Sequence, residues 1–199
     1  MSRHILLAVT GMSPQVVTET LYAIHRQGRT WPDEIQLITT RTGRDAAVRG
    51  LLEEQQLERL CRDYERPCPR FSEESVLMVP GADATPVDDA RSVSDHEALA
   101  DFITATVCDL TATEGEVEET TLHASLAGGR KTMTFYLGYA MSLFGRQSDC
   151  LSHVLVTETF EGLREFYYPT PDSRMIHDRA GNALDASQAE VVLADIPLI

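Results

Sequence analysis

The residues best suited to chemistry stand in one short segment, 121–134, which reads Thr-Leu-His-Ala-Ser-Leu-Ala-Gly-Gly-Arg-Lys-Thr-Met-Thr. An apolar stretch typical of a strand runs into Gly128 and Gly129, and the cations Arg130 and Lys131 follow where a helix should begin. Glycines let backbone N–H groups converge on an anion, and a helix N-terminus with two full charges adds to the positive field. The segment predicts a phosphate site, although a Gly-Gly turn with solvated cations would give the same pattern.

The elements around this segment alternate between strands and helices. Apolar runs predict strands at residues 5–10, 35–39, 75–79, 121–127 and 151–157, with weaker ones at 166–168 and 191–199. Helical spacing predicts four helices. The first covers 13–28, with Ser13 as N-cap and Pro14 in the first turn, and the second covers about 44–63. The third begins with a capping box at 94–97 and extends to 110, and the fourth extends from the two cations to Gly145. On the last helix, Met133, Leu137, Met141 and Phe144 should form the buried stripe. Residues 80–93 read as a loop and acidic 114–119 as a solvated turn. The fold class is therefore α/β, with a doubly wound, mostly parallel sheet and helices on both faces.

Two loops should meet in this fold. In the common doubly wound order the first and fourth strands are neighbours and their helices leave to opposite faces, which opens a crevice at the carboxyl ends. The loops at 10–15 and 127–132 would line it, so the candidate site residues are Thr10, Gly11, Met12, Ser13, Gln15, Ala127, Gly128, Gly129, Arg130, Lys131 and Thr132. Thr40 and Arg44 follow the second strand and are candidates for contact with a base or ribose, with ordinary loop roles equally open.

Composition limits the ligand that this crevice could hold. A chain of 199 residues with 43% hydrophobic residues is long enough for one buried core, and we expect a single domain over residues 1–199. A net charge of −14 argues against a broad surface for DNA or long RNA, because such binding relies on many phosphate contacts. A small anion at a local cationic spot remains compatible with that charge.

Targeting segments and metal motifs are not recognisable in the sequence. The apolar run at the start is too short for a signal peptide, and no run approaches membrane-spanning length, so we expect a cytoplasmic protein without membrane contact. The four cysteines form no C-x-x-C pair and the six histidines have no ligand spacing: Cys61, Cys68, Cys108, Cys150, His4, His25, His96, His123, His153 and His177. We expect reduced thiols, no metal site and no cofactor.

Two familiar nucleotide motifs do not match. A Walker A loop needs a glycine directly before its lysine, and Arg130 stands there instead. The dinucleotide fingerprint needs three glycines after the first strand, where only Gly11 occurs. These mismatches disfavour ATP hydrolysis by a P-loop and binding of NAD.

Three segments carry a family resemblance: Leu-Leu-Ala-Val-Thr-Gly-Met-Ser-Pro-Gln-Val-Val-Thr-Glu-Thr-Leu at 6–21, Asp-Asp-Ala-Arg at 88–91 and Ser-Leu-Ala-Gly-Gly-Arg-Lys-Thr-Met at 125–133. Together they resemble the CRISPR-associated Rossmann-fold (CARF) family, in the group of ring nucleases and sensor domains of CRISPR ribonucleases. The resemblance implies a Rossmann-like fold and a homodimer that binds a cyclic oligoadenylate, most often the tetra-adenylate, across its two-fold axis. Some members also cleave the ring without metal.

Such cleavage has definite requirements. Each ribose supplies a 2′-hydroxyl beside the scissile phosphate, so an in-line arrangement and donors for the developing charge suffice to form a 2′,3′-cyclic phosphate. Lys131 is the first candidate to neutralise that charge, with Arg130 and the Gly128 and Gly129 amides in support. Thr10 and Ser13 could orient the ribose or phosphate, and Thr132 could bind a phosphate oxygen.

Each of these assignments has a structural competitor. Ser13 is equally suited to cap its helix, Thr132 to stand in a first turn without a ligand, and Arg130 to pair with carboxylates at a dimer contact. Asp88, Asp89 and Arg91 lie in a loop that could cover the ligand.

Larger relatives continue into an effector domain, frequently a HEPN ribonuclease with an Arg-x-x-x-x-His motif. This spacing occurs once, from Arg91 to His96, where the sequence predicts the end of a loop and the start of a helix. We expect no HEPN or other effector domain within the chain. The leading hypothesis is a ring nuclease that ends type III antiviral signalling. The alternatives are a sensor that binds the ring without cleaving it, and an unrelated phosphate-compound enzyme on the same scaffold.

Overall fold

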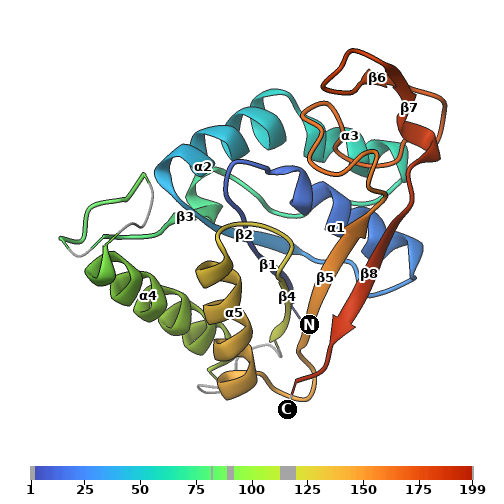
Figure 1. The fold of residues 1–199 in the computed structure, drawn as a ribbon. Coiled ribbons are helices and arrows are strands. Elements are labelled where there is room, and N and C mark those ends of the chain that lie inside the picture. Colours follow the sequence, from blue (N-terminus) through green and yellow to red (C-terminus); the bar gives the residue numbers. More distant parts are fainter. Residues whose placement is uncertain (1–2, 82, 89–91, 113–119, 199) are drawn as a thin grey trace.

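The computed structural model describes residues 3–81, 83–88, 92–112 and 120–198. Its centre is a six-stranded sheet in the order β3-β2-β1-β4-β5-β8 (Figure 1). The strands are β1 (Arg3–Val9), β2 (Glu34–Thr39), β3 (Val76–Met78), β4 (Thr120–Ser125), β5 (Cys150–Val156) and β8 (Val191–Ile196). All neighbours pair in parallel except β5 and β8, which are antiparallel. The predicted α/β class and mostly parallel sheet are confirmed, and β1 and β4 are neighbours as expected.

Helices cover both faces of this sheet (Figure 1). On one face, α1 (Gln15–Arg26) packs with the helical stretch that comprises α2 (Arg41–Ala47), a π-helical turn (Val48–Glu53) and α3 (Gln56–Asp63). The other face carries α4 (Val93–Thr111) and α5 (Lys131–Phe144). Since α1 leaves β1 to one face and α5 leaves β4 to the other, the sheet has its switch point between β1 and β4.

Strand β1 shows why its sequence is apolar without alternation. Leu6 and Ala8 belong to the cluster beneath α1, whereas Ile5, Leu7 and Val9 belong to the cluster beneath α4 and α5. A strand buried on both faces needs apolar side chains at every position. Strand β1 can therefore contribute residues to a ligand site only at its end, where the chain leaves the sheet.

The prediction of one continuous helix over 44–63 is wrong, because the structure divides this region into three helical segments. Helical structure begins already at Arg41, widens into the π-helical turn, and breaks at Gln55, whose φ of 57° is left-handed. A residue with positive φ cannot continue a right-handed helix, so α3 starts anew at Gln56 with Leu57 and Leu60 inward.

Details of three other helices differ from the prediction. Pro14, not Ser13, is the N-cap of α1, and no side chain caps that helix. The capping box of α4 is formed by Ser92 and Asp95, two residues before the predicted one, because this pair has the same Ser-x-x-acid spacing. Phe144 is 37% exposed and is not part of the buried stripe of α5, whose buried residues are Met133, Leu137, Ala140 and Met141.

The C-terminal part departs most from the sequence-based expectation. Residues 166–168 form no strand; Phe166 and Tyr168 are buried in an irregular segment, where the Tyr168 hydroxyl donates to an Asp63 carboxylate oxygen at 2.9 Å. A small hairpin of β6 (Met175–His177) and β7 (Ala183–Asp185) was not predicted. Short 3-10 turns precede β3 (Glu73–Ser75) and β8 (Ala186–Gln188). Aromatic burial, rather than sheet pairing, explains the apolar character of 166–168.

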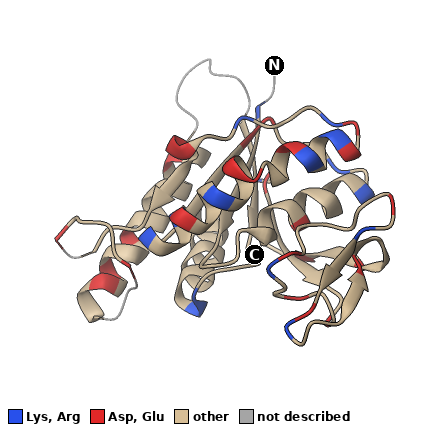
Figure 2. Ribbon diagram, turned by 90° about the horizontal axis from the view of Figure 1, so that it is seen from above, with Lys and Arg blue, Asp and Glu red and all other residues tan. Residues whose placement is uncertain are grey.

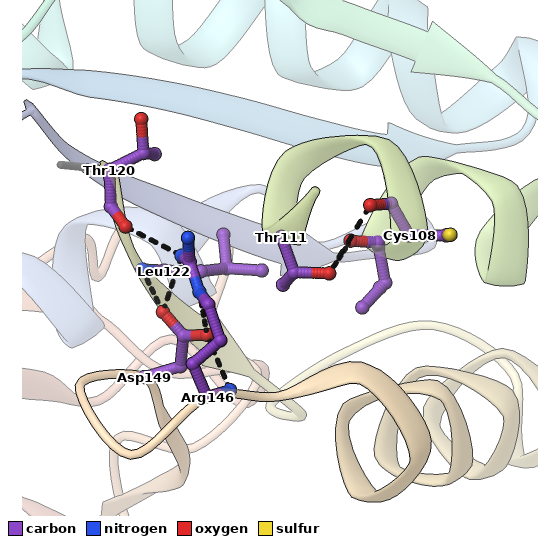
Figure 3. Close-up of polar contacts among 7 residues, drawn as sticks. Cys108, Thr111, Thr120, Leu122, Arg146 and Asp149 are labelled. Atoms are coloured by element: carbon purple, nitrogen blue, oxygen red, sulfur yellow. Dashed lines mark hydrogen bonds and ion pairs between the residues drawn. The ribbon is translucent and has the colours of Figure 1, made fainter. Parts of the chain in front are cut away.

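A partly buried ion pair between Arg146 and Asp149 holds the amino ends of β4 and β5 together (Figure 3). The Asp149 side chain has no exposed surface and accepts hydrogen bonds from the Leu122 amide at 2.8 Å and from the Arg146 guanidinium at 2.9 Å. Arg146 also donates to the Thr120 carbonyl oxygen at 2.5 Å. Removing one partner of such a pair costs roughly 3–5 kcal/mol, so this cluster has a structural role far from the loops.

Two predicted segments fall largely outside the described residues. Of the loop segment 88–91 only Asp88 is described, with its carboxylate 3.6 Å from Arg41, and the acidic turn at 114–119 is not described. Within the described ranges, no helix is long and apolar enough to cross a membrane.

Candidate functional site

The first loop of the candidate site connects β1 to α1 and is closed by Thr10. Its amide donates to the Ile38 carbonyl oxygen at 3.0 Å and its hydroxyl donates to the Ser13 carbonyl oxygen at 2.8 Å. Thr10 is fully buried, whereas Met12 and Ser13 are exposed. The Thr10 hydroxyl is therefore committed to the turn, and the side chains at 12 and 13 are the ones that face outward.

The second loop connects β4 to α5. Gly129 has a φ of 84°, which favours glycine over any residue with a side chain. Arg130 is the N-cap of α5 in an extended conformation and makes no side-chain cap, and its carbonyl oxygen accepts from the Met133 and Thr134 amides. Lys131 is the first residue of the helix and is exposed. The uncapped amides of this helix start and the Lys131 ammonium group form a positive end.

The two loops lie in direct contact. A Cβ built on Gly128 would lie 3.0 Å from the Val9 carbonyl oxygen and 3.2 Å from the Thr10 Cα, and one built on Gly11 would lie 3.7 Å from the Gly129 Cα. A side chain at Gly128 would press against Val9 and Thr10, which would have to shift by a few tenths of an ångström. The loops predicted to share a crevice thus meet at the carboxyl ends of β1 and β4, while the ligand roles of their residues stay predictions.

The junction of β2 and α2 joins this group. Gly43 approaches the first loop so closely that a built Cβ would lie 2.6 Å from the Gly11 carbonyl oxygen. Thr40 is the N-cap of α2, its hydroxyl accepting from the Gly43 amide at 3.3 Å. The Arg44 guanidinium is paired with Glu73 at 2.6 Å. Thr40 therefore holds the junction in place, and Arg44 has a protein partner.

Thr132 differs from its prediction in accessibility. Its hydroxyl oxygen is shielded from solvent and has no hydrogen-bond partner among the described residues. Binding of a phosphate oxygen by Thr132 stays a prediction.

Two hollows flank the first loop. The larger, of about 520 Å³, extends from Met12 and Gln15 toward the C-terminal segment and is lined by the cations Arg49, Arg164 and Arg174. The acidic side chains Glu54 and Glu165 also line it. These arginines were not predicted as site residues, because they come from distant parts of the chain and belong to no motif.

The smaller hollow, of about 240 Å³, touches both loops. Ser13, Gln15 and Glu19 line it from the α1 side, and Ala127 lines it from the second loop. The carbonyl oxygen of Arg164 accepts from the Gln15 Nε2 at 3.0 Å, whereas the Gln15 Oε1 is buried without a partner among the described residues. Burial, reinforced by the charge of Glu161, raises the pKa of Glu19 to about 8. A polar wall of this kind suits a ligand with both donors and acceptors.

A further cavity of about 320 Å³ lies at the opposite edge of the sheet, where Ile5, Thr121 and Cys150 mark the amino-terminal parts of their strands. It contains His123, whose Nε2 is 2.7 Å from the buried Ser152 hydroxyl and whose pKa burial lowers to about 4. Ligands of doubly wound folds bind at the carboxyl edge, so this cavity is not part of the candidate site. Among the described residues, no group of three or more histidine, cysteine or acidic side chains is arranged to hold a metal ion.

The strand order and the paired loops define the class of the protein: a doubly wound α/β chain with its loops gathered at the switch point. Residues 13–199 match the family model described as CRISPR-associated protein NE0113. The chain therefore belongs to this family of CRISPR-associated proteins, and the CRISPR association implied by the sequence resemblance is confirmed. No curated protein matches the chain.

Two of the solved structures that match are remote. Enterococcus italicus Csm6 bound to cyclic hexa-2′-fluoro-hexa-dAMP is 11% identical with a TM-score of 0.47, over 77% of this chain and 33% of that one. A Listeria monocytogenes protein assigned as a UDP-N-acetylglucosamine 2-epimerase is 10% identical with a TM-score of 0.36, over 77% of this chain and 31% of that one. This chain thus spans about a third of each, and neither likeness carries a functional argument.

Proposed function

We propose that this CRISPR-associated protein binds a cyclic oligoadenylate, with cyclic tetra-adenylate favoured, and cleaves it without metal ions to linear products with 2′,3′-cyclic phosphate ends. Destruction of this second messenger would end type III antiviral signalling in the cytoplasm. Residues 1–199 act as one module in this proposal, without an effector domain of their own.

The observation that carries the proposal is the contact between the two loops. Gly128 and Gly129 bring the start of α5 against Thr10 and Gly11, so that an anion bound at the helix start would also face the first loop. Membership in a CRISPR-associated family restricts the anions to be considered, and the sequence resemblance to ring nucleases selects a cyclic oligoadenylate.

The chemistry needs little from the protein beyond position and charge. The 2′-oxygen loses its proton and forms a bond to phosphorus, and the bond from phosphorus to the 5′-oxygen breaks as that oxygen takes up a proton. Negative charge develops on the phosphoryl oxygens during this exchange. An ammonium group at Lys131 and the uncapped amides at the start of α5 would stabilise that charge.

A homodimer follows from the ligand and is supported by an apolar surface on α5. Phe135, Tyr139 and Leu143 are 63%, 53% and 55% exposed and lie at helical spacing on one side of this helix. The rings of Phe135 and Tyr139 stack with centroids 6.0 Å apart. Lys131 is the only charged residue of α5, and the rest of the helix is tan in Figure 2. A two-fold axis beside this surface would present Lys131 twice to a ring with equivalent phosphates.

The deciding experiment incubates the purified protein with cyclic tetra-adenylate in excess EDTA and separates the products chromatographically. Linear products with 2′,3′-cyclic phosphate ends are expected. Tight binding with an intact ring would contradict the nuclease and leave a sensor. Absence of binding, together with a thermal shift from another phosphate compound, would indicate an unrelated enzyme.

A further inference from the structure

Glu19 is a buried carboxyl group that the proposed cleavage does not use. It lies one turn inside α1, it is only 6% exposed, and it lines the smaller hollow between the two loops. Within the part of the chain that the structure describes, burial and the charge of Glu161 raise the pKa of its carboxyl group, and no hydrogen-bond donor or cation counteracts them. Burial of a carboxyl group without a partner is unfavourable, so a side chain left in this state at a pocket wall needs an explanation.

The hollow has the size and the position for one base of a bound ring. Its volume of about 240 Å³ is below the roughly 300–1,000 Å³ typical of pockets for whole drug-sized ligands. Ser13 and Ala127 place it beside both loops, so a nucleotide with its phosphate at the start of α5 could direct its base into the hollow. A second unpartnered polar atom, the buried Gln15 Oε1, belongs to the same wall.

The protonation state of the carboxyl group decides which base it can read. A neutral carboxylic acid offers one O–H donor and one carbonyl acceptor, which is the complement of a ring nitrogen and the exocyclic amine of adenine. An ionised carboxylate only accepts, and it suits the N1–H and amino donors of guanine instead. Burial and the nearby Glu161 charge keep Glu19 protonated at neutral pH, since its pKa is raised to about 8.

We infer that Glu19 is an adenine-specificity residue: its carboxyl O–H donates to an adenine ring nitrogen and its carbonyl oxygen accepts from the adenine amino group. This inference rests on the proposed binding of a cyclic oligoadenylate and extends it to base recognition. Gln15 supplies an additional acceptor for the amino group through its Oε1.

Few titratable side chains lie close enough to Glu19 in the hollow to change its protonation. Besides Glu19, the titratable residues lining the hollow are His153 of β5 and Glu161 of the segment after β5. Neither the part of the hollow wall from α1 nor that from the second loop adds a further charge. Replacement of Glu161 by glutamine should therefore shift the pH midpoint of ligand binding downward, because it removes the charge that helps to keep Glu19 neutral.

The test measures binding of cyclic tetra-adenylate by calorimetry from pH 7 to pH 9. Wild-type affinity should fall as Glu19 ionises, whereas the Glu19→Gln variant, which keeps one donor and one acceptor, should bind equally across this range. Glu19→Ala should weaken binding by about 10- to 100-fold at pH 7, because the adenine edge loses its partners. Glu58→Gln, an exposed change on α3, is the matched control.

The outcomes separate the inference from the proposed function. Parallel pH profiles for wild type and Glu19→Gln, or an affinity of Glu19→Ala equal to that of the control, would overturn the role of Glu19 while ring binding stands. A wild-type protein that binds no cyclic tetra-adenylate at pH 7 would overturn the proposed function and this inference with it. Circular dichroism of both Glu19 variants verifies their fold, and Glu19→Gln alone is sufficient for the pH arm.

Discussion

Lys131 is the only lysine of the 199 residues, and it stands exposed at the first residue of α5. All other permanent side-chain cations are arginines, several of which are paired with carboxylates, as Arg29 is with Asp195 at 2.6 Å. A compact ammonium group at an uncapped helix start concentrates charge at one point. The proposed cleavage accordingly depends on this residue more than on any other.

Replacement of Lys131 by alanine should lower the rate of cyclic tetra-adenylate cleavage by about 100-fold, the usual effect of removing one donor to a developing anion. Single-turnover rates with saturating protein measure this effect apart from binding. Arg59→Ala removes an exposed cation from α3 and should leave the rate unchanged. Full activity of Lys131→Ala would remove this side chain from the mechanism.

Glu19 also makes the stability of the free protein depend on pH. Its pKa is about 8 in the folded chain and about 4.3 in an unfolded one, so the folded state holds the proton more tightly. The stabilisation is present in full when the pH lies below the pKa of Glu19 in the unfolded chain, and it is lost as pH rises toward 8. The free energy of unfolding should fall by about 3 kcal/mol between pH 5 and pH 7.5. Urea unfolding of wild type and Glu19→Gln at both pH values should show this loss in wild type only. An equal change in the free energy of unfolding for wild type and Glu19→Gln would mean that Glu19 is ionised in the folded protein.

At the scale of elements, backbone contact between two loops creates the candidate site. The β1–α1 and β4–α5 loops touch at Gly11, Gly128 and Gly129, and the β2–α2 junction closes on them through Gly43. A Cβ at Gly43 or Gly128 would crowd the backbone of the first loop, whereas one at Gly11 would make an ordinary van der Waals contact with Gly129. The glycines thus determine how closely an anion can approach the amides of both loops.

Gly128→Ala tests this contact, since its Cβ would lie 3.0 Å from a carbonyl oxygen that cannot move independently of β1. We expect a loss of stability of about 1–3 kcal/mol and a loss of ring affinity of about tenfold or more. Gly28→Ala serves as control, because φ is +64° there but nothing lies within 4 Å. It should lose about 1 kcal/mol of stability through strain alone and keep its affinity. Equal affinities of the two variants would contradict a ligand site at the loop contact.

At the scale of the whole molecule, the charge of −14 opposes both association and the binding of a polyanion. Acidic residues are distributed over several elements, whereas α5 carries none (Figure 2). An apolar interface along α5 would bring two chains together at the face with the least repulsion. The proposed dimer and the proposed anion site therefore depend on the same helix.

Phe135→Glu should weaken this dimer by about tenfold or more, because large aromatic side chains dominate interface energies. Sedimentation equilibrium should then show a shift toward the 22.1 kDa monomer, with a parallel loss of cleavage. Met175→Glu, which alters another exposed apolar residue on β6, should leave both properties unchanged. A Phe135→Glu protein that remains dimeric would assign the interface to another surface.

Much of the fold could be predicted from local sequence signals, and the errors have physical causes. The central strands were recognised because burial on both faces makes them continuously apolar, as in β1. The buried segment with Phe166 and Tyr168 has the same apolar character without pairing, so it was mistaken for a strand. The break at Gln55 carries no glycine or proline to reveal it.

The sequence by itself determined the α/β class, the glycine-rich loop with its cations and the resemblance to a CRISPR-associated family, because each of these depends on neighbouring residues. Only the tertiary structure decided that the loops after β1 and β4 touch, that the Thr10 hydroxyl is committed to its own turn, and that Glu19 is buried beside Glu161. Strand order and burial bring together residues that are far apart in the chain, and local patterns contain no record of those distances.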